Sequence, residues 1–215
     1  MKVELNVPTS LADITLGDYQ RFLKAVKDEE NEYMIQQHVL TILCGLNATQ
    51  ARYVKAVDAK AITDLVFEIF EQEPKLVRTF KMNGQKFGFI PDLNEMSFGE
   101  MVDIDKYIGD YETIHLSMGA MYRPIETEHK DLYTIKDYVP NSFDMKQMPM
   151  DAVVGSVVFF YHLGKDLSIV TMDSLQNSKE VEYLQNQVSQ QSGVGINPFM
   201  LSLKEMLQDL KISLN

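Results

Sequence analysis

The sequence is poor in several residue types, and each shortage excludes a class of protein. It contains one cysteine and no tryptophan among 215 residues. A single cysteine cannot form an internal disulfide or a multi-cysteine metal site, which fits a reducing compartment or a protein indifferent to redox conditions. Cys44 lies in the apolar stretch MIQQHVLTILCGL. With no cation nearby to lower the pKa of its thiol, we expect a buried small hydrophobe and not a nucleophile.

Long hydrophobic runs are absent as well. The longest, around Val157 to Tyr161, is much shorter than the ~20 residues that cross a bilayer. The N-terminal stretch MKVELNVPTS lacks the apolar core of a signal peptide. We therefore expect neither a membrane-spanning segment nor secretion by that route.

Basic residues are scarce relative to acidic ones. Twenty Lys and Arg stand against 31 Asp and Glu, for a net charge of -11. This charge repels a phosphate backbone, so we expect no specific nucleic-acid binding, although an acidic wall along which DNA slides remains compatible with it. Hydrophobic residues make up 45% of the chain, which is enough to build a core.

The familiar catalytic motifs are missing too. The sequence has no GxSxG, Walker or GxGxxG motif, and we expect no cofactor. Asp103 and Asp105 can in principle share acid and base work, as in a hydrolase, but no pocket or electrophile is indicated beside them. We therefore expect a protein that is not an enzyme. Metal-ligand spacing is absent among the four histidines, which are His38, His115, His129 and His162.

The apolar spacing predicts a helical N-terminal part over residues 10–72. Its helices are expected at 16–26, 31–44 and 48–72, with a break near Asp58, after an edge strand or arm at 2–7. Leu65, Val66 and Ile69 should lie on the buried face of the last of these helices.

A central part over residues 76–140 follows, with a hairpin and an acidic segment. Asn83-Gly84 suits a type I′ turn between strands at 76–82 and 85–90. Ser97 is expected to cap a short helix that starts at Phe98, and Pro124 to end a helix over 110–122. Residues 132–138 should be extended.

The C-terminal part, residues 141–215, is predicted to be helical. A helix should start after Pro149, with Gly155 and Ser156 allowing close packing. A weaker helix is expected at 179–190 and an amphipathic one at the end of the chain. Together the three parts predict a single α+β domain, predominantly α-helical, with a β-hairpin near residues 76–90.

An acidic window lies between Pro91 and His115. It holds seven carboxylates against one lysine, a local charge of -6. The sequence does not match a calcium-binding loop that starts at Asp103. Such a loop needs an oxygen ligand at its fifth position and glycine at its sixth, where this chain has Tyr107 and Ile108. We expect a solvated or partner-facing surface.

Arg123, in the pentad MYRPI, is expected at a helix end, where it can pair with a carboxylate of the acidic window. The pairing is interpreted first as a contact within the chain and second as one between subunits.

The 13 methionines are interpreted first as core filling and second as an adaptable binding surface.

Four stretches taken together carry a resemblance to a known group of proteins. In order they are ITLGDYQRFLKAV, NGQKFGFIPDLNEMSFGEMVDID, HLSMGAMYRPI and VVGSVVFFYHL. Over residues 10–165 the chain resembles structural or morphogenesis proteins of tailed bacteriophages, particularly the crAss-like and related Bacteroidetes phages. The resemblance implies a role in virion assembly, located in the virion and, during assembly, in the host cytoplasm.

From these features we expect a non-enzymatic virion structural protein, a ring-forming neck, connector or tail-barrel subunit. The alternatives are a tail assembly chaperone and an internal virion cargo protein. Expected partners are portal, neck or tail components and further copies of the chain in a homo-oligomeric ring. The residues expected to contact partners are Asp92, Glu95, Glu100, Asp103, Asp105, Arg123, Phe199 and Met206.

Overall fold

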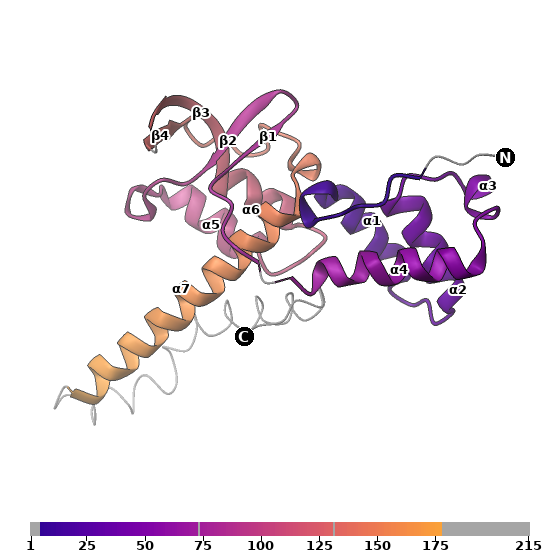
Figure 1. The fold of residues 1–215 in the computed structure, drawn as a ribbon. Coiled ribbons are helices and arrows are strands. Elements are labelled where there is room, and N and C mark those ends of the chain that lie inside the picture. Colours follow the sequence, from indigo (N-terminus) through magenta and orange to yellow (C-terminus); the bar gives the residue numbers. More distant parts are fainter. Residues whose placement is uncertain (1–4, 73, 131, 178–215) are drawn as a thin grey trace.

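The computed structural model describes residues 5–72, 74–130 and 132–177, with the backbone alone for 167–177. Helices at the N-terminal end adjoin a four-stranded antiparallel sheet, and a long helix follows the sheet (Figure 1). The fold is mixed α+β and predominantly helical, with a hairpin at the expected place, so the predicted fold class is confirmed.

The N-terminal part is built from helices whose ends follow local signals. The side chain of Thr15 accepts a hydrogen bond from the Asp18 backbone and starts α1 as predicted. The second helix runs into a π-helical turn at Val39–Leu43, after which Gly45 adopts a φ of 71°. The bounds are α1 (Leu16–Val26), α2 (Glu32–His38), α3 (Ala48–Ala51) and α4 (Ala56–Phe70).

Two expectations for this part were wrong in detail, and a third, the edge strand or arm at 2–7, is only partly covered by the described residues. The break in the third helical stretch falls at residues 52–55, and Asp58 lies in the first turn of α4, where a carboxylate complements the helix dipole. Leu65 is exposed instead of buried, because the core contacts of α4 come from Val66 and Ile69. Residues 5–7, the described part of the expected arm, form no strand.

The sheet is a meander in which each strand pairs with its neighbours in sequence. The predicted hairpin is confirmed, and both of its turn residues, Asn83 (φ 51°) and Gly84 (φ 76°), have the positive φ of a type I′ turn. The third strand is a finding that the sequence did not predict. The strands are β1 (Thr79–Met82), β2 (Gln85–Phe89), β3 (Tyr122–His129) and β4 (Leu132–Ile135).

Three further helices complete the described chain. Ser97 caps α5 as predicted, and α6 ends at Met121, directly before β3. The sequence predicted close helix packing at Gly155, and the close approach is present but to the segment before β1, because a Cβ there would lie 2.1 Å from the carbonyl oxygen of Lys75. The bounds are α5 (Phe98–Tyr107), α6 (Ile114–Met121) and α7 (Met150–Asn177). The helix expected at 179–190 and the final amphipathic helix lie outside the described residues.

One continuous cluster of buried side chains joins the N-terminal helices to the sheet and to α7. At its centre Tyr122 is fully buried, and its hydroxyl donates to the carbonyl oxygen of Val77 over 2.8 Å. The starts of α1 and α7 are tied together, because the Leu16 amide donates to the Met148 carbonyl over 2.8 Å. Met145 and Met150 are also buried, which supports core filling as the main use of methionine in the described chain.

Candidate interaction surface

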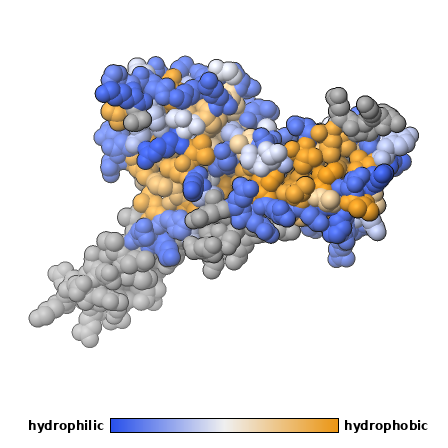
Figure 2. Space-filling model, viewed as in Figure 1, coloured by the Kyte–Doolittle hydropathy of each residue, from blue (hydrophilic) through white to orange (hydrophobic). Residues whose placement is uncertain are grey.

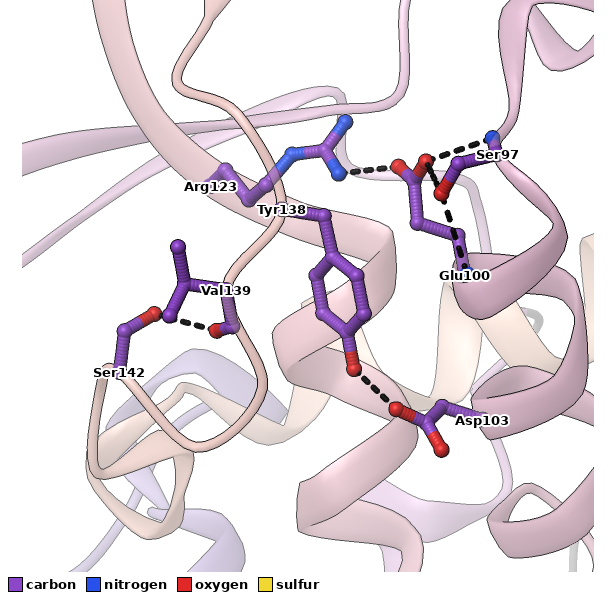
Figure 3. Close-up of polar contacts among 7 residues, drawn as sticks. All are labelled: Ser97, Glu100, Asp103, Arg123, Tyr138, Val139 and Ser142. Atoms are coloured by element: carbon purple, nitrogen blue, oxygen red, sulfur yellow. Dashed lines mark hydrogen bonds and ion pairs between the residues drawn. The ribbon is translucent and has the colours of Figure 1, made fainter.

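The carboxylates of the acidic window are divided between two faces of the structure. Asp92, Glu95 and Asp105 are exposed. Glu100 and Asp103 point from α5 toward the rest of the protein, where each meets a named partner (Figure 3). The window is therefore not one uniform acidic face, because two of its carboxylates, Glu100 and Asp103, are used in contacts with distant parts of the chain.

Glu100 forms a buried ion pair with Arg123 of β3 (Figure 3). The two residues are 4% and 8% exposed. The other carboxylate oxygen of Glu100 accepts hydrogen bonds from the Ser97 backbone, at 2.7 Å, and from the Ser97 hydroxyl. Burial raises the pKa of Glu100, but the hydrogen bonds from Ser97 and the charge of Arg123 together hold that pKa below its usual value. Glu100 is therefore ionised at neutral pH and fixes the start of α5 against the sheet.

A second polar contact fixes the same helix one turn later. The hydroxyl of Tyr138 donates to the carboxylate of Asp103, and burial together with this carboxylate raises the pKa of Tyr138. The guanidinium carbon of Arg123 lies 5.9 Å from the centre of the Tyr138 ring (Figure 3). Tyr138 therefore lies beside Arg123 and is also hydrogen-bonded to Asp103 of α5. These contacts determine which side of α5 faces inward.

The opposite side of α5 exposes three large apolar side chains. Phe98 is 82% exposed, Met101 57% and Val102 44%, and their spacing places them on one face of the helix. Glu95 precedes them and Asp105 follows them one turn later, both exposed. We call these five residues the α5 surface. An exposed apolar stripe between carboxylates is typical of a protein-binding surface.

A hollow lies between α1 and α4. Its volume is about 620 Å³, within the ~300–1,000 Å³ of ligand pockets, and its walls are mainly apolar. The lining includes Phe22, Leu23, Val26, Ile35 and Phe67. Figure 2 shows hydrophobic residues gathered over the N-terminal helices and beneath the sheet. This hollow is a second place where apolar side chains of a partner would fit.

The described residues among those predicted to contact partners fall into three groups. Glu100 and Arg123 are used within the chain, which agrees with the first interpretation of Arg123, although the arginine lies on β3 and not at a helix end. Asp103 is half-buried against Tyr138. The exposed group consists of Asp92, Glu95 and Asp105, while Phe199 and Met206 lie outside the described residues.

The sequence reasoning missed the apolar part of the α5 surface. Phe98, Met101 and Val102 look like core residues, because exposed aromatic and aliphatic side chains are the exception on a short helix. A signal was present, since α5 also carries the buried Ile104 on its other side. When a helix has apolar residues on two opposite faces, one face packs against the core and the other is left at the surface.

Two negative findings apply to the described part of the chain. It contains no group of three or more His, Cys, Asp or Glu side chains placed to hold a metal ion. None of its helices combines the length and the apolar character needed to cross a membrane.

In comparisons with known proteins, no family, no curated protein and no solved structure matches the chain.

Proposed function

We propose that the chain is a non-enzymatic structural protein of a tailed-bacteriophage virion, a subunit of a ring-forming neck, connector or tail barrel. The phage assignment rests on the sequence resemblance over residues 10–165. Its partners are portal, neck or tail components and further copies of the chain. It resides in the virion, and in the host cytoplasm while particles assemble.

The observation that carries a binding role is the exposure of Phe98 on a helix that a buried ion pair and a half-buried hydrogen bond hold in place. Burying a side chain of this kind contributes about 1.5–3 kcal/mol. Met101 and Val102 extend the same stripe, so a partner would gain from covering all three. Aromatic anchors of this type often dominate the binding free energy of protein interfaces.

Mass spectrometry of gradient-purified particles tests the assignment. A ring subunit should be present in fixed stoichiometry with the portal. A phage that carries Phe98→Asp should assemble particles without the protein or fail to assemble. The matched control is Val57→Asp on α4, because Val57 is 80% exposed and also apolar but lies outside the α5 surface. Absence of the wild-type protein from purified particles would overturn the proposal.

One observation favours an alternative, a tail assembly chaperone. The hollow between α1 and α4 offers an apolar volume of 620 Å³ that can accept side chains of a client protein. A chaperone, in contrast to a ring subunit or an internal cargo protein, leaves before the particle is complete. The same mass spectrometry experiment therefore separates the alternatives, since a chaperone is abundant in infected cells and missing from particles.

A further inference from the structure

We propose that the α5 surface of one copy binds the basic edge of the sheet of a second copy, in a head-to-tail contact that can repeat. This inference rests on the proposed function, because it identifies the two surfaces through which copies of a ring subunit would meet. The basic edge consists of β1 and the three cations on or just before it, Lys75, Arg78 and Lys81. We call it the β1 edge.

The β1 edge is open in the described structure. The strand order is β1-β2-β3-β4, so β1 pairs on one side only. The carbonyl oxygen of Arg78 accepts a hydrogen bond from the amide of Phe89. Arg78 therefore occupies a hydrogen-bonded position opposite the end of β2. Since bonded and non-bonded positions alternate in an antiparallel pair, Thr79 and Lys81 direct their backbone groups away from β2.

The charges of this edge are unusual for the chain. Three cations fall within seven residues, although the whole chain has a net charge of -11. Lys75, Arg78 and Lys81 are exposed, and none of them forms an ion pair with another described residue. The nearby Lys86, by contrast, is paired with Glu128. The β1 edge therefore has positive charge available to a partner.

Apolar surface accompanies these cations. Val77 and Phe80 are only partly buried against the core, so each keeps some surface beside the strand. The α5 surface offers the complementary arrangement, with Phe98 at its centre and Glu95 and Asp105 at its ends. Apolar contact would supply most of the affinity, and the opposite charges would select the pairing and its direction.

Symmetric pairings of either surface are disfavoured. Two α5 surfaces related by a two-fold axis would bring Glu95 of one copy toward Asp105 of the other. Two β1 edges would bring lysine and arginine together, which is how natural edge strands avoid pairing with their own kind. The crossed pairing places the carboxylates of one surface against the three cations of the other. No residue belongs to both surfaces, so one copy can use both at once, and such a heterologous contact closes into a ring or continues as a filament.

Sedimentation velocity of the purified full-length chain tests the contact. Wild type should form species larger than a dimer as its concentration rises through the micromolar range, and added salt should weaken the association. An acid-reversed variant carries Glu95→Lys with Asp105→Lys, and a base-reversed variant carries Arg78→Glu with Lys81→Glu. Each variant alone should associate about tenfold more weakly or not at all.

An equimolar mixture of the two variants is the decisive sample. The base-reversed copy keeps its acidic α5 surface, and the acid-reversed copy keeps its basic β1 edge, so the wild-type contact re-forms between them. The second contact in the mixture joins a basic α5 surface to an acidic β1 edge and is also attractive. Association should therefore return in the mixture. All four positions are exposed, and circular dichroism of each variant confirms that folding is retained.

Phe98→Asp tests the apolar centre of the contact. It should abolish association at all salt concentrations, whereas the control Val57→Asp should leave it unchanged. The inference is overturned if wild type stays monomeric, if the reversed variants associate as wild type does, or if their mixture fails to associate. None of these results decides whether the protein is present in particles, so the proposed function stands or fails separately by mass spectrometry.

Discussion

Glu100 of α5 and Arg123 of β3 form an ion pair in which both side chains are almost completely buried. The same carboxylate closes the first turn of α5 through Ser97. The position of the helix against the sheet and the start of the helix therefore depend on one side chain.

Replacing Arg123 by methionine should destabilise the protein by about 3 kcal/mol, because it leaves the Glu100 carboxylate buried without its cation. Urea unfolding at pH 7, followed by circular dichroism, measures the loss. The matched control is Arg52→Met, which removes an exposed arginine outside both proposed surfaces and should change the free energy of unfolding by less than about 0.5 kcal/mol. Equal stability of Arg123→Met and wild type would show that the pair contributes nothing.

Replacing both partners should cost less than replacing Arg123 alone. In the double variant Arg123→Met, Glu100→Leu no charge remains buried, and apolar side chains fill the space. The remaining loss should be about 1 kcal/mol, because Glu100 no longer completes the capping box with Ser97. A double variant less stable than Arg123→Met would contradict this account.

The contribution of Glu100 should depend on pH in a defined direction. Its pKa is lower in the folded protein than the usual value of 4.5, so its stabilising effect is complete above about pH 4.5 and is lost as the pH falls through the folded-state pKa. Glu100→Gln cannot ionise. The difference in free energy of unfolding between wild type and Glu100→Gln should therefore shrink as the pH falls from 7 to about 3.

Comparison with this variant isolates Glu100 from other acidic groups. Asp13 also has a lowered pKa, through hydrogen bonds from Thr9 and Ser10, and burial raises that of Asp151. Both groups titrate in wild type and variant alike, so their effects cancel in the difference. A difference that stayed constant over the whole pH range would exclude the ionised form of Glu100 as its source.

Gly155→Ala should destabilise the protein by about 1–3 kcal/mol. The added Cβ would lie 2.1 Å from the Lys75 carbonyl oxygen, and a backbone atom cannot rotate away, so α7 must shift. This outweighs the gain of up to about 1 kcal/mol that alanine gives over glycine in a helix. Gly99→Ala on α5 is the control. Its nearest neighbour, the Ser97 hydroxyl, is 4.0 Å away, so thermal unfolding should show unchanged or slightly higher stability.

Cys44 should be inert in the folded protein. It is 3% exposed, and burial raises the pKa of its thiol from 9.0 to about 11. At pH 8 its thiolate fraction is then about 100-fold lower than in the unfolded chain, and the sulfur is also covered. Titration with a thiol reagent such as DTNB should give almost no reaction until denaturant is added. Rapid reaction of the native protein would show that the helices around Cys44 open easily.

Local patterns predicted the features that depend on local chemistry. The turn at Asn83-Gly84 needs positive φ, the cap at Ser97 needs a hydroxyl, and the close approach at Gly155 needs the missing side chain. Each of these requirements can be read from a few neighbouring residues. The predicted hairpin, the helix 16–26 and the start of a helix at Phe98 accordingly match the structure.

Features that depend on distant partners were not predictable in this way. The third strand starts directly after α6 and contains Pro124, and its strand geometry comes from pairing with β2, in which Arg123 lies opposite Gly88. Likewise, Glu100 and Asp105 look equivalent in the sequence. The ion pair with Arg123, 23 residues along the chain, is available to Glu100, which is buried, and not to Asp105, which stays at the surface.

One carboxylate oxygen of Glu100 binds Ser97 and the other pairs with Arg123. This arrangement would affect both the rate and the affinity with which a partner binds the α5 surface. Rotating the helix to hide Phe98 would require breaking the ion pair and unwinding the first turn together. The apolar stripe is consequently rigid before any encounter, and a partner loses little conformational entropy in meeting it. A substitution that removes the contacts of Glu100 would lower the association rate of a partner with the α5 surface, although Glu100 itself is buried away from that surface.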